Sequence, residues 1–232
     1  MCPFKYFLEY HLGIPTRISL AAEIGKFVHK IFEKIARGEL DFKNWVDWAA
    51  ENYKVLEKVP NPKNVNIWHE VLSLVRAVLN RKKEFIPFYR NIKDVEKFFK
   101  IEVDNIPIRG IFDLIIEIDP ETVEIYDWKS GSFRLRYKEL YRDPQILLYN
   151  LAVSKLFPKH KFRFATLDYL RYTPISVPLE SKYLTIARQL VKRYWWLIKH
   201  DDSPRRIEVP NHICKYMCDR ELCNIYWEET HG

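Results

Sequence analysis

The sequence lacks any long hydrophobic run, since no stretch of 18 or more apolar residues occurs among its 232 residues. A transmembrane helix needs about 20 such residues. The N-terminal residues Met1 to Lys5 also lack the charged region and apolar run of a secretory signal peptide. We therefore expect an intracellular, cytoplasmic protein with no membrane partner.

Glycine is scarce as well, with six residues in the chain. Gly25-Lys26 has no upstream glycine of the kind that a phosphate-binding P-loop requires. The chain also contains no internal repeat and no low-complexity tract. Because 47% of its residues are hydrophobic and 15% are aromatic, it can bury one large core. We expect a single domain over residues 1–232 with insertions.

The net charge indicates a binding partner, and the cysteines indicate a bound metal. A formal net charge of +7 favours a polyanion, because Lys and Arg near phosphates release condensed counterions. The chain has four cysteines, one near its start and three near its end, namely Cys2, Cys214, Cys218 and Cys223. In a reducing compartment such a set indicates metal rather than disulfides. Four thiolates suit a [4Fe-4S] cluster or Zn²⁺, and either would staple the two terminal regions together.

The order of the periodic segments predicts a mixed α/β fold. Apolar residues recur at helical spacing from Leu20 to Arg37, and Gly38 is well placed to end that helix. From about residue 40 to 95 the pattern indicates a helical insertion, broken at Pro60-Asn61-Pro62. The remaining segments are predicted as strands Phe98–Val103, Ile106–Ile118 and Thr122–Trp128, a helix Pro144–Leu156 capped by Asp143, a strand at about Phe162–Tyr172 and a helix at about Ser181–His200.

The strongest chemical signal lies in the predicted three-strand meander. Strand alternation places Asp127 and Lys129 on one face, and the turn near Pro120 brings Asp113 onto the neighbouring strand. A two-residue turn at Pro120-Glu121 would put the two aspartates on opposite faces. Pairing them therefore requires an odd-length loop or a β-bulge.

Two carboxylates suit Mg²⁺ or Mn²⁺, which prefer oxygen ligands and polarise a scissile phosphate. The ammonium of Lys129 would orient the attacking water and offset developing charge. The alternative is a surface hairpin with scattered charges, because Asp-x-Lys is a common tripeptide.

Two further pairs of residues, each spaced one helical turn apart, support the catalytic interpretation. His29 lies one turn after Gly25, whose missing side chain lets another element approach, and its imidazole could complete a metal shell. Gln145 and Tyr149 also lie one turn apart and could hold a phosphate or water. Each pair has a structural alternative, in which His29 edges an apolar stripe and Tyr149 belongs to the core.

In this order, the stretches resemble the RecB/AddB-type nuclease domain of the PD-(D/E)xK superfamily, most closely its CRISPR-associated iron-sulfur exonuclease branch. The resemblance covers nearly the whole chain, although the last cysteines are spaced C-x3-C-x4-C where that branch more often has C-x2-C-x5-C. It implies a restriction-endonuclease-like core, a central mixed β-sheet flanked by helices. It further implies that His29, Asp113, Asp127 and the Trp128 carbonyl ligate a divalent ion, that Lys129 is catalytic, that Gln145 and Tyr149 position DNA or water, and that the four cysteines hold the cluster.

The function implied by the resemblance is a metal-dependent DNA nuclease, chiefly a single-stranded DNA exonuclease with endonuclease activity in some members. Its context would be DNA recombination and repair, CRISPR adaptation in antiviral defence, or a virus or mobile element, and its partners DNA and a CRISPR integrase or another recombination protein. Trp68, Tyr89 and Tyr141 are candidates for stacking bases. The alternative is a non-catalytic module that binds DNA ends or a partner and is stapled by a four-cysteine metal site. The presence of Asp113, Asp127 and Lys129 together favours the enzyme.

Overall fold

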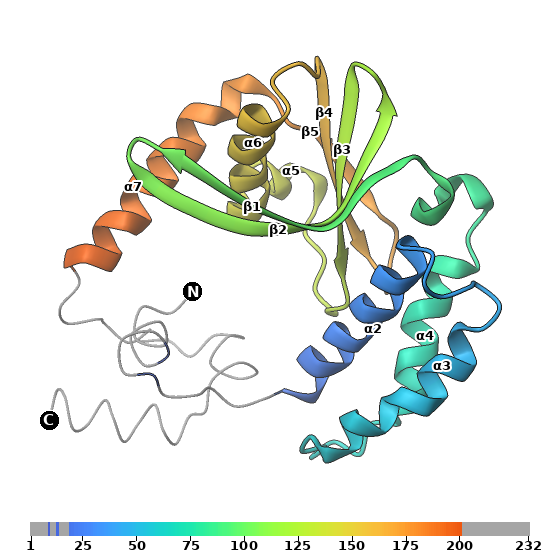
Figure 1. Ribbon diagram of the computed structural model, residues 1–232. Helices are drawn as coiled ribbons and strands as arrows, with labels where there is room; N and C mark the ends of the chain where they lie inside the picture. Colours follow the sequence, from blue (N-terminus) through green and yellow to red (C-terminus); the bar gives the residue numbers. More distant parts are fainter. Residues whose placement is uncertain (1–8, 10–12, 14–18, 201–232) are drawn as a thin grey trace, which may run out of the picture.

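The computed structural model describes residues 9, 13 and 19–200 (Figure 1). The four cysteines, and with them the predicted cluster at Cys2 and residues 214–223, lie outside this part of the chain. The described helices, with 3-10 turns marked η, are α2 Leu20–Ala36, α3 Trp45–Asn52, η2 Tyr53–Lys58, α4 Ile67–Leu79, η3 Lys83–Phe85, η4 Pro87–Tyr89, α5 Tyr137–Leu140, α6 Pro144–Leu156, η5 Ser181–Tyr183 and α7 Leu184–His200. The strands are β1 Ile92–Val103, β2 Ile106–Asp119, β3 Thr122–Lys129, β4 Phe162–Tyr169 and β5 Ile175–Pro178.

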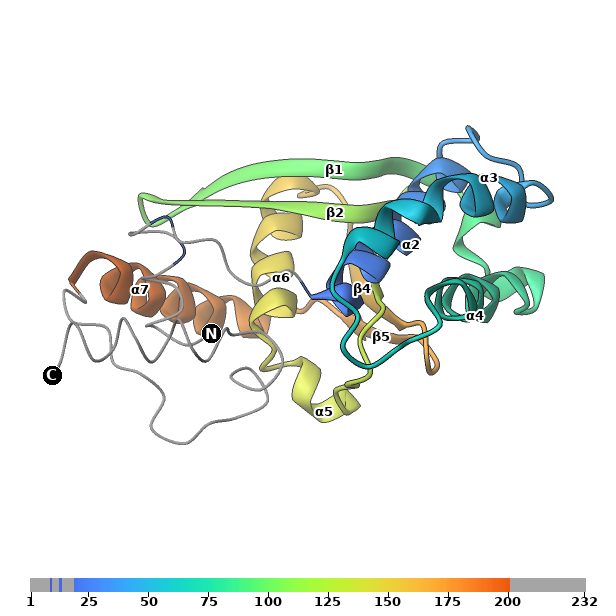
Figure 2. The same ribbon diagram turned by 90° about the horizontal axis from the view of Figure 1, so that it is seen from below.

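These strands form one mixed sheet in the order β1-β2-β3-β4-β5. The first three make the predicted antiparallel meander, β4 runs parallel to β3 after the crossover through α6, and β5 returns antiparallel to β4. Helices α2 to α4 cover one face, and α6 and α7 cover the other (Figures 1 and 2). The expected central mixed sheet flanked by helices is confirmed.

Helix α2 forms where the apolar spacing predicted it. Its buried side chains, among them Val28, Ile31 and Phe32, pack against α4 and the sheet. The helix ends one residue earlier than predicted, with Arg37 as its C-cap and Gly38 in the left-handed region at φ +72°. Within the described part of the chain, no helix combines the length and the hydrophobicity that a membrane span requires.

Helix α6 lies on the opposite face. It begins at Pro144, as predicted, and the Asp143 side chain accepts hydrogen bonds from the backbone N–H groups of Gln145 (2.9 Å) and Ile146 (3.2 Å). Its buried residues pack against Phe112 and other side chains of the sheet. The cap therefore fixes the helix turn from which Gln145 projects.

The structure differs from the prediction at several further strands and helices. Strand β1 begins at Ile92, inside the segment assigned to the helical insertion, because its first residues pair with the inner part of β2. Strand β4 ends at Tyr169, where the chain turns and the Tyr172 N–H donates a hydrogen bond to the Tyr169 carbonyl. The short elements β5 and α5 were not predicted, since neither is long enough to show a clear hydrophobic period.

A buried ion pair ties the helical layer to the sheet. The guanidinium of Arg81, just after α4, donates two hydrogen bonds to Asp168 on β4, at 2.7 and 2.8 Å. Tyr126 donates a third to the same fully buried carboxylate at 2.7 Å. Such a bidentate pair fixes orientation as well as distance. It holds α4 against the sheet face that also carries Trp128.

Candidate active site

A β-bulge brings the two aspartates into line. The chain turns at Pro120-Glu121, with Asp119 opposite Thr122, and the register then shifts so that Glu117 faces Val123. Ile118 is therefore the extra residue. Farther along, Leu114 lies opposite Tyr126, which makes Asp113 level with Asp127. The two-residue turn and the bulge occur together, so the register condition set by the sequence is met.

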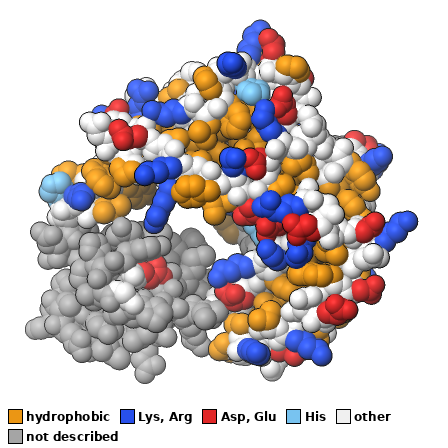
Figure 3. Space-filling view, viewed as in Figure 1, with side chains coloured by type: hydrophobic (Ala, Val, Ile, Leu, Met, Phe, Trp, Pro, Cys, Tyr) orange, Lys and Arg blue, Asp and Glu red, His pale blue; other side chains and the backbone are white. Residues whose placement is uncertain are grey.

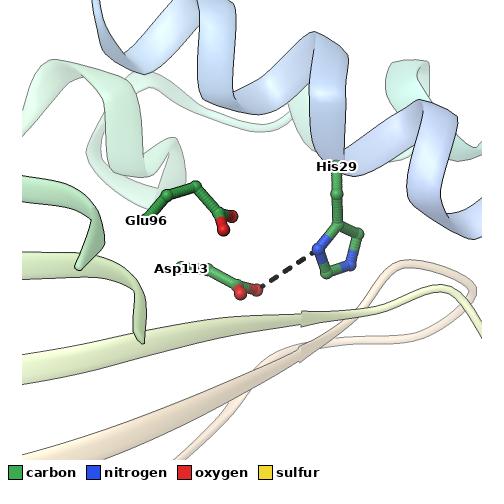
Figure 4. A group of neighbouring side chains, drawn as sticks. All are labelled: His29, Glu96 and Asp113. Atoms are coloured by element: carbon green, nitrogen blue, oxygen red, sulfur yellow. Dashed lines mark ion pairs between the residues drawn. The ribbon is translucent and has the colours of Figure 1, made fainter. Parts of the chain in front are cut away.

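Asp113 meets the imidazole of His29 from the facing helix (Figure 4). Its Oδ2 accepts a hydrogen bond from the Trp128 N–H at 2.8 Å and lies 3.6 Å from His29 Nδ1. The other ring nitrogen, Nε2, donates to the Trp128 carbonyl at 3.0 Å. In the neutral ring this leaves the lone pair of Nδ1 directed toward the carboxylate.

Glu96 completes this cluster, and sequence reasoning missed it. Ligand atoms of His29, Glu96 and Asp113 all lie within 4.8 Å of one another. The sequence could have revealed the position of Glu96. A two-residue turn at Asp104-Asn105 pairs Val103 with Ile106, and counting back along both strands from that pair sets Glu96 across from Asp113. Glu96 adopts φ +50°, a left-handed conformation that is unfavourable for a residue with a side chain.

Asp127 is held in a separate hydrogen-bond network that reaches α6. Its Oδ1 accepts from Gln145 Nε2 at 2.6 Å and from the Tyr149 hydroxyl at 2.7 Å. Its buried Oδ2 receives no hydrogen bond from a described residue, and the Lys129 ammonium lies 2.5 Å away as an ion pair. Lys129 donates to Gln145 Oε1 at 2.7 Å, and Gln145 to the Tyr149 hydroxyl at 2.8 Å. The four residues predicted for this part of the site are therefore in direct contact.

Burial and mutual repulsion dominate the electrostatics. Burial, and next the nearby charge of Asp127, raise the pKa of Asp113 to about 8. Burial also raises the pKa of Glu96, with the charge of Glu33 as the next cause. Burial lowers the pKa of His29, which favours the neutral imidazole. Close carboxylates that resist ionisation together are stabilised by a bound cation, so the site favours one.

The donor set suits a hard divalent ion with one nitrogen ligand. His29, Glu96 and Asp113 offer one imidazole nitrogen and two carboxylates at ligand spacing. The Oδ2 of Asp127, which is ion-paired with Lys129, is a further oxygen donor. Asp127 itself does not belong to the three-residue cluster, and the Trp128 carbonyl, expected as a ligand, accepts the His29 hydrogen bond.

A cleft of about 370 Å³ adjoins the network. Lys129 and Gln145 line it together with Ser130, Gly131 and Phe133. The size suits part of a nucleotide rather than a folded partner. Lys129 thus lies between the carboxylates and an open volume.

Gly25 is where α2 approaches the end of β3. A Cβ at this position would lie 2.4 Å from Ser130 Oγ, closer than any non-bonded contact. The expectation that a missing side chain allows a close approach is therefore met, and the partner is the residue directly after Lys129. This contact sets the distance between His29, one turn later, and the strand.

Similarity to known proteins is found in both sequence and fold. Residues 1–210 match the model of the PD-(D/E)XK nuclease superfamily. Curated relatives include the exonuclease/helicase subunit RexB of Lactococcus lactis subsp. cremoris, 24% identical over 98% of this chain and 22% of the relative. Another is an ATP-dependent helicase/deoxyribonuclease subunit from Streptococcus agalactiae, 23% identical over 66% of this chain and 15% of the relative.

The chain thus spans less than a quarter of the length of these curated relatives. Among solved structures, a putative exonuclease from Eubacterium rectale superposes with a TM-score of 0.54. It is 15% identical, and the match covers 94% of this chain and 82% of that one. At this identity the likeness concerns the fold, and it agrees with the mixed sheet flanked by helices.

Proposed function

The chain belongs to the PD-(D/E)XK nuclease superfamily, and on that premise we propose that it is a metal-dependent DNA nuclease whose active site is built by His29, Glu96, Asp113, Asp127 and Lys129. One observation carries the proposal: the bulge at Ile118 aligns two buried aspartates beside an imidazole and an ion-paired lysine. A surface hairpin with scattered charges would not bury them, whereas Asp113 and Asp127 are 9% and 4% exposed.

His29, Glu96 and Asp113 would hold the divalent ion, with Asp127 Oδ2 as a further donor. When bound, the ion would polarise the scissile phosphate and neutralise charge as the phosphorane forms. We assign the ion as Mn²⁺ or Mg²⁺, with an imidazole ligand shifting the preference toward Mn²⁺.

The remaining residues orient the reaction. Lys129 would align the attacking water and offset negative charge on the phosphorane. The water oxygen forms a bond to phosphorus and gives up one proton to the solvent, the bond to the leaving sugar oxygen breaks, and that oxygen takes up a proton from the solvent. Gln145 keeps Lys129 and Asp127 together, because it accepts from one and donates to the other. Tyr149 donates to Asp127 Oδ1 and limits rotation of the carboxylate.

The finer assignment is a single-stranded DNA exonuclease, with endonuclease cleavage as a second mode. The Lactococcus lactis relative is named an exonuclease/helicase subunit, which supports exonuclease activity for this chain too. The net charge of +7 supports DNA as the partner. We propose recombination and repair, CRISPR adaptation, or a viral or mobile-element role as its context, with a recombination protein or CRISPR integrase as a protein partner.

We also propose that Cys2, Cys214, Cys218 and Cys223 hold a [4Fe-4S] cluster, with Zn²⁺ as the alternative. The support is chemical: these are the only cysteines in the chain, and they gather at its two ends. The cluster would stabilise the fold and take no part in hydrolysis.

The test uses single- and double-stranded DNA labelled at either end, incubated with Mn²⁺ or Mg²⁺. Lys129→Ala should lower the rate by about 10²–10³-fold, because a charge-stabilising donor is lost. Lys54→Ala, an exposed lysine on η2, is the matched control and should degrade DNA like the wild type. Glu96→Gln should raise the Mn²⁺ concentration needed for half-maximal activity, since one carboxylate ligand is lost.

Wild-type activity in the Lys129 variant would refute the assigned role. If neither protein degrades DNA but both bind its ends, the alternative of a non-catalytic DNA-end module holds instead.

A further inference from the structure

The outer face of the β1–β2 hairpin carries an exposed apolar pair followed by a basic pair. Phe98 lies opposite Ile111 in the register, and these side chains are 57% and 49% exposed. The next pair on the same face joins Lys100 to Arg109. In Figure 3, hydrophobic and basic side chains lie next to one another over this hairpin.

This face leads to the metal-binding cluster formed by His29, Glu96 and Asp113. Side-chain alternation is interrupted at that cluster, where Glu96 has φ +50° and the flanking Val95 and Leu114 pack on the α2 side of the sheet. Beyond it, Phe98 and Lys100 on β1, and Ile111 and Arg109 on β2, point away from α6. The side chains between them, such as Phe99 and Phe112, are buried under α6. At a strand rise of 3.3–3.4 Å per residue, Arg109 lies about 13 Å along β2 from Asp113.

The basic pair has no partner in the described part of the chain. Like charges directly opposite each other destabilise a sheet. Lys100 and Arg109 face one another, and neither forms an ion pair with a described residue. Elsewhere on this hairpin the lysines are paired, as Lys97 is with Asp94 and Lys93 with Glu117. An anion between Lys100 and Arg109 would remove the repulsion.

Two of the rings suggested by the sequence as base-stacking sites are already stacked on other rings. Tyr89 stacks on Phe42 with ring centroids 5.1 Å apart. Tyr141 stacks on Tyr183 at 4.9 Å. Phe98 has no such ring contact among the described residues, so its face is open to a base.

We propose that this face, the Phe98, Ile111, Lys100 and Arg109 side chains, binds the DNA strand on its way to the metal-binding cluster. The inference rests on the proposed function, since it extends the same site. Phe98 and Ile111 contact the bases, and Lys100 and Arg109 contact phosphates. Stacking on Phe98 requires an unpaired base, so the face selects a single strand over a duplex. A protein partner would cover the apolar pair but would leave two repelling cations unexplained.

Binding is measured by fluorescence anisotropy of a labelled oligothymidine in EDTA, where no hydrolysis occurs. Phe98→Leu keeps an apolar side chain but removes the ring, and should weaken binding about tenfold, the equivalent of one stacked base. Phe98→Trp should restore wild-type affinity. A fully paired duplex of equal length should show little change in either variant. Val55→Ala, at an exposed position on η2, is the matched control.

The basic pair is tested by charge reversal. Lys100→Glu with Arg109→Glu should weaken binding and reduce the slope of log affinity against log salt by about 1.4, or 0.7 for each phosphate contact on a single strand. Lys54→Glu with Lys58→Glu reverses two charges on η2 and should leave the slope unchanged.

Unchanged affinity and slope in both sets of variants would overturn the inference. Equal loss in Phe98→Leu and Phe98→Trp, together with a lowered melting temperature, would also overturn it, because it would show that the face supports the fold. The proposed function fails separately: a wild-type protein that binds the strand in EDTA but never degrades it with metal would refute the nuclease and leave the binding face intact.

Discussion

The proton on Asp113 links the chemistry of the site to the stability of the chain. Burial and the charge of Asp127 raise its pKa to about 8, whereas an aspartate in the unfolded chain titrates near its ordinary value of 3.8. Between these two values the folded state holds a proton that the unfolded state has released. A divalent ion bound at the proposed site would have to displace that proton before the Asp113 carboxylate could act as a ligand.

We predict that, without metal, the stability attributable to Asp113 falls as the pH rises from about 4 toward 8. The slope approaches 1.4 kcal/mol per pH unit, because the folded state binds one proton more than the unfolded state. The measurement is the free energy of unfolding in EDTA from pH 5 to pH 9, for the wild type and for Asp113→Asn. The variant cannot titrate there, so the difference between the two proteins isolates this group. Parallel curves would contradict the prediction, and saturating Mn²⁺ should flatten the wild-type curve.

At the scale of single elements, α2 and the end of β3 depend on one close contact. Gly25 admits Ser130, and Ser130 follows Lys129 directly. Alanine is a better helix former than glycine by about 1 kcal/mol, so Gly25→Ala favours α2 itself. The added Cβ nevertheless forces the Ser130 hydroxyl aside.

We therefore predict that Gly25→Ala lowers the rate of DNA hydrolysis several-fold while the melting temperature holds or rises. Adding Ser130→Gly should restore the rate, because the clashing hydroxyl is gone. The rates and melting temperatures of the two single variants and the double variant form the test. Full activity in Gly25→Ala would show that the end of β3 adjusts freely to the added Cβ. If adding Ser130→Gly did not restore the rate, the loss of activity would not come from the contact with Ser130.

The sequence predicted those elements that have a long hydrophobic period or a distinct cap. Helix α2 and helix α6 with Asp143 are examples, and the meander followed from its turn residues. It did not predict β5 or α5, which are too short for periodicity to show.

The residues predicted for the catalytic site lie close together, but their grouping differs from the prediction, and the four cysteines lie outside the described residues. Glu96 was missed because reading the strand from Phe98 left it outside the sheet, although the Asp104-Asn105 turn fixes its partner. The contacts of Asp127 with Gln145 and Tyr149 depend on how α6 docks on the sheet. Local sequence patterns carry no information on such docking.

At the scale of the whole molecule, the site lies where two hydrophobic layers meet. One core packs α2 and α4 against the sheet, and the other packs α6 and α7 against the opposite face. His29 comes from the first layer, whereas Gln145 and Tyr149 come from the second. A bound ion would therefore join groups whose relative placement depends on both cores.

The proposed cysteine cluster would join regions still farther apart in sequence. We predict that Cys218→Ala lowers the melting temperature by about 10–20 °C, because closing so long a loop is worth about 5 kcal/mol by analogy with a disulfide. Lys54→Ala, an exposed position that leaves the cysteines and the buried Asp127–Lys129 pair intact, should melt like the wild type. The purified wild type should be brown, absorb at about 400 nm and contain iron rather than zinc. An unchanged melting temperature in the Cys218 variant would count against a structural cluster.

The bulge at Ile118 also bears on how this segment of the gene can change. Because side chains on a strand alternate, removing a single codon from the turn between β2 and β3 would leave the reading frame intact yet exchange Asp127 for Trp128. An indole would then enter the carboxylate site and a carboxylate the core beneath α2. Removing two codons would preserve the alternation. Insertions and deletions tolerated in this turn should therefore change its length by an even number of residues.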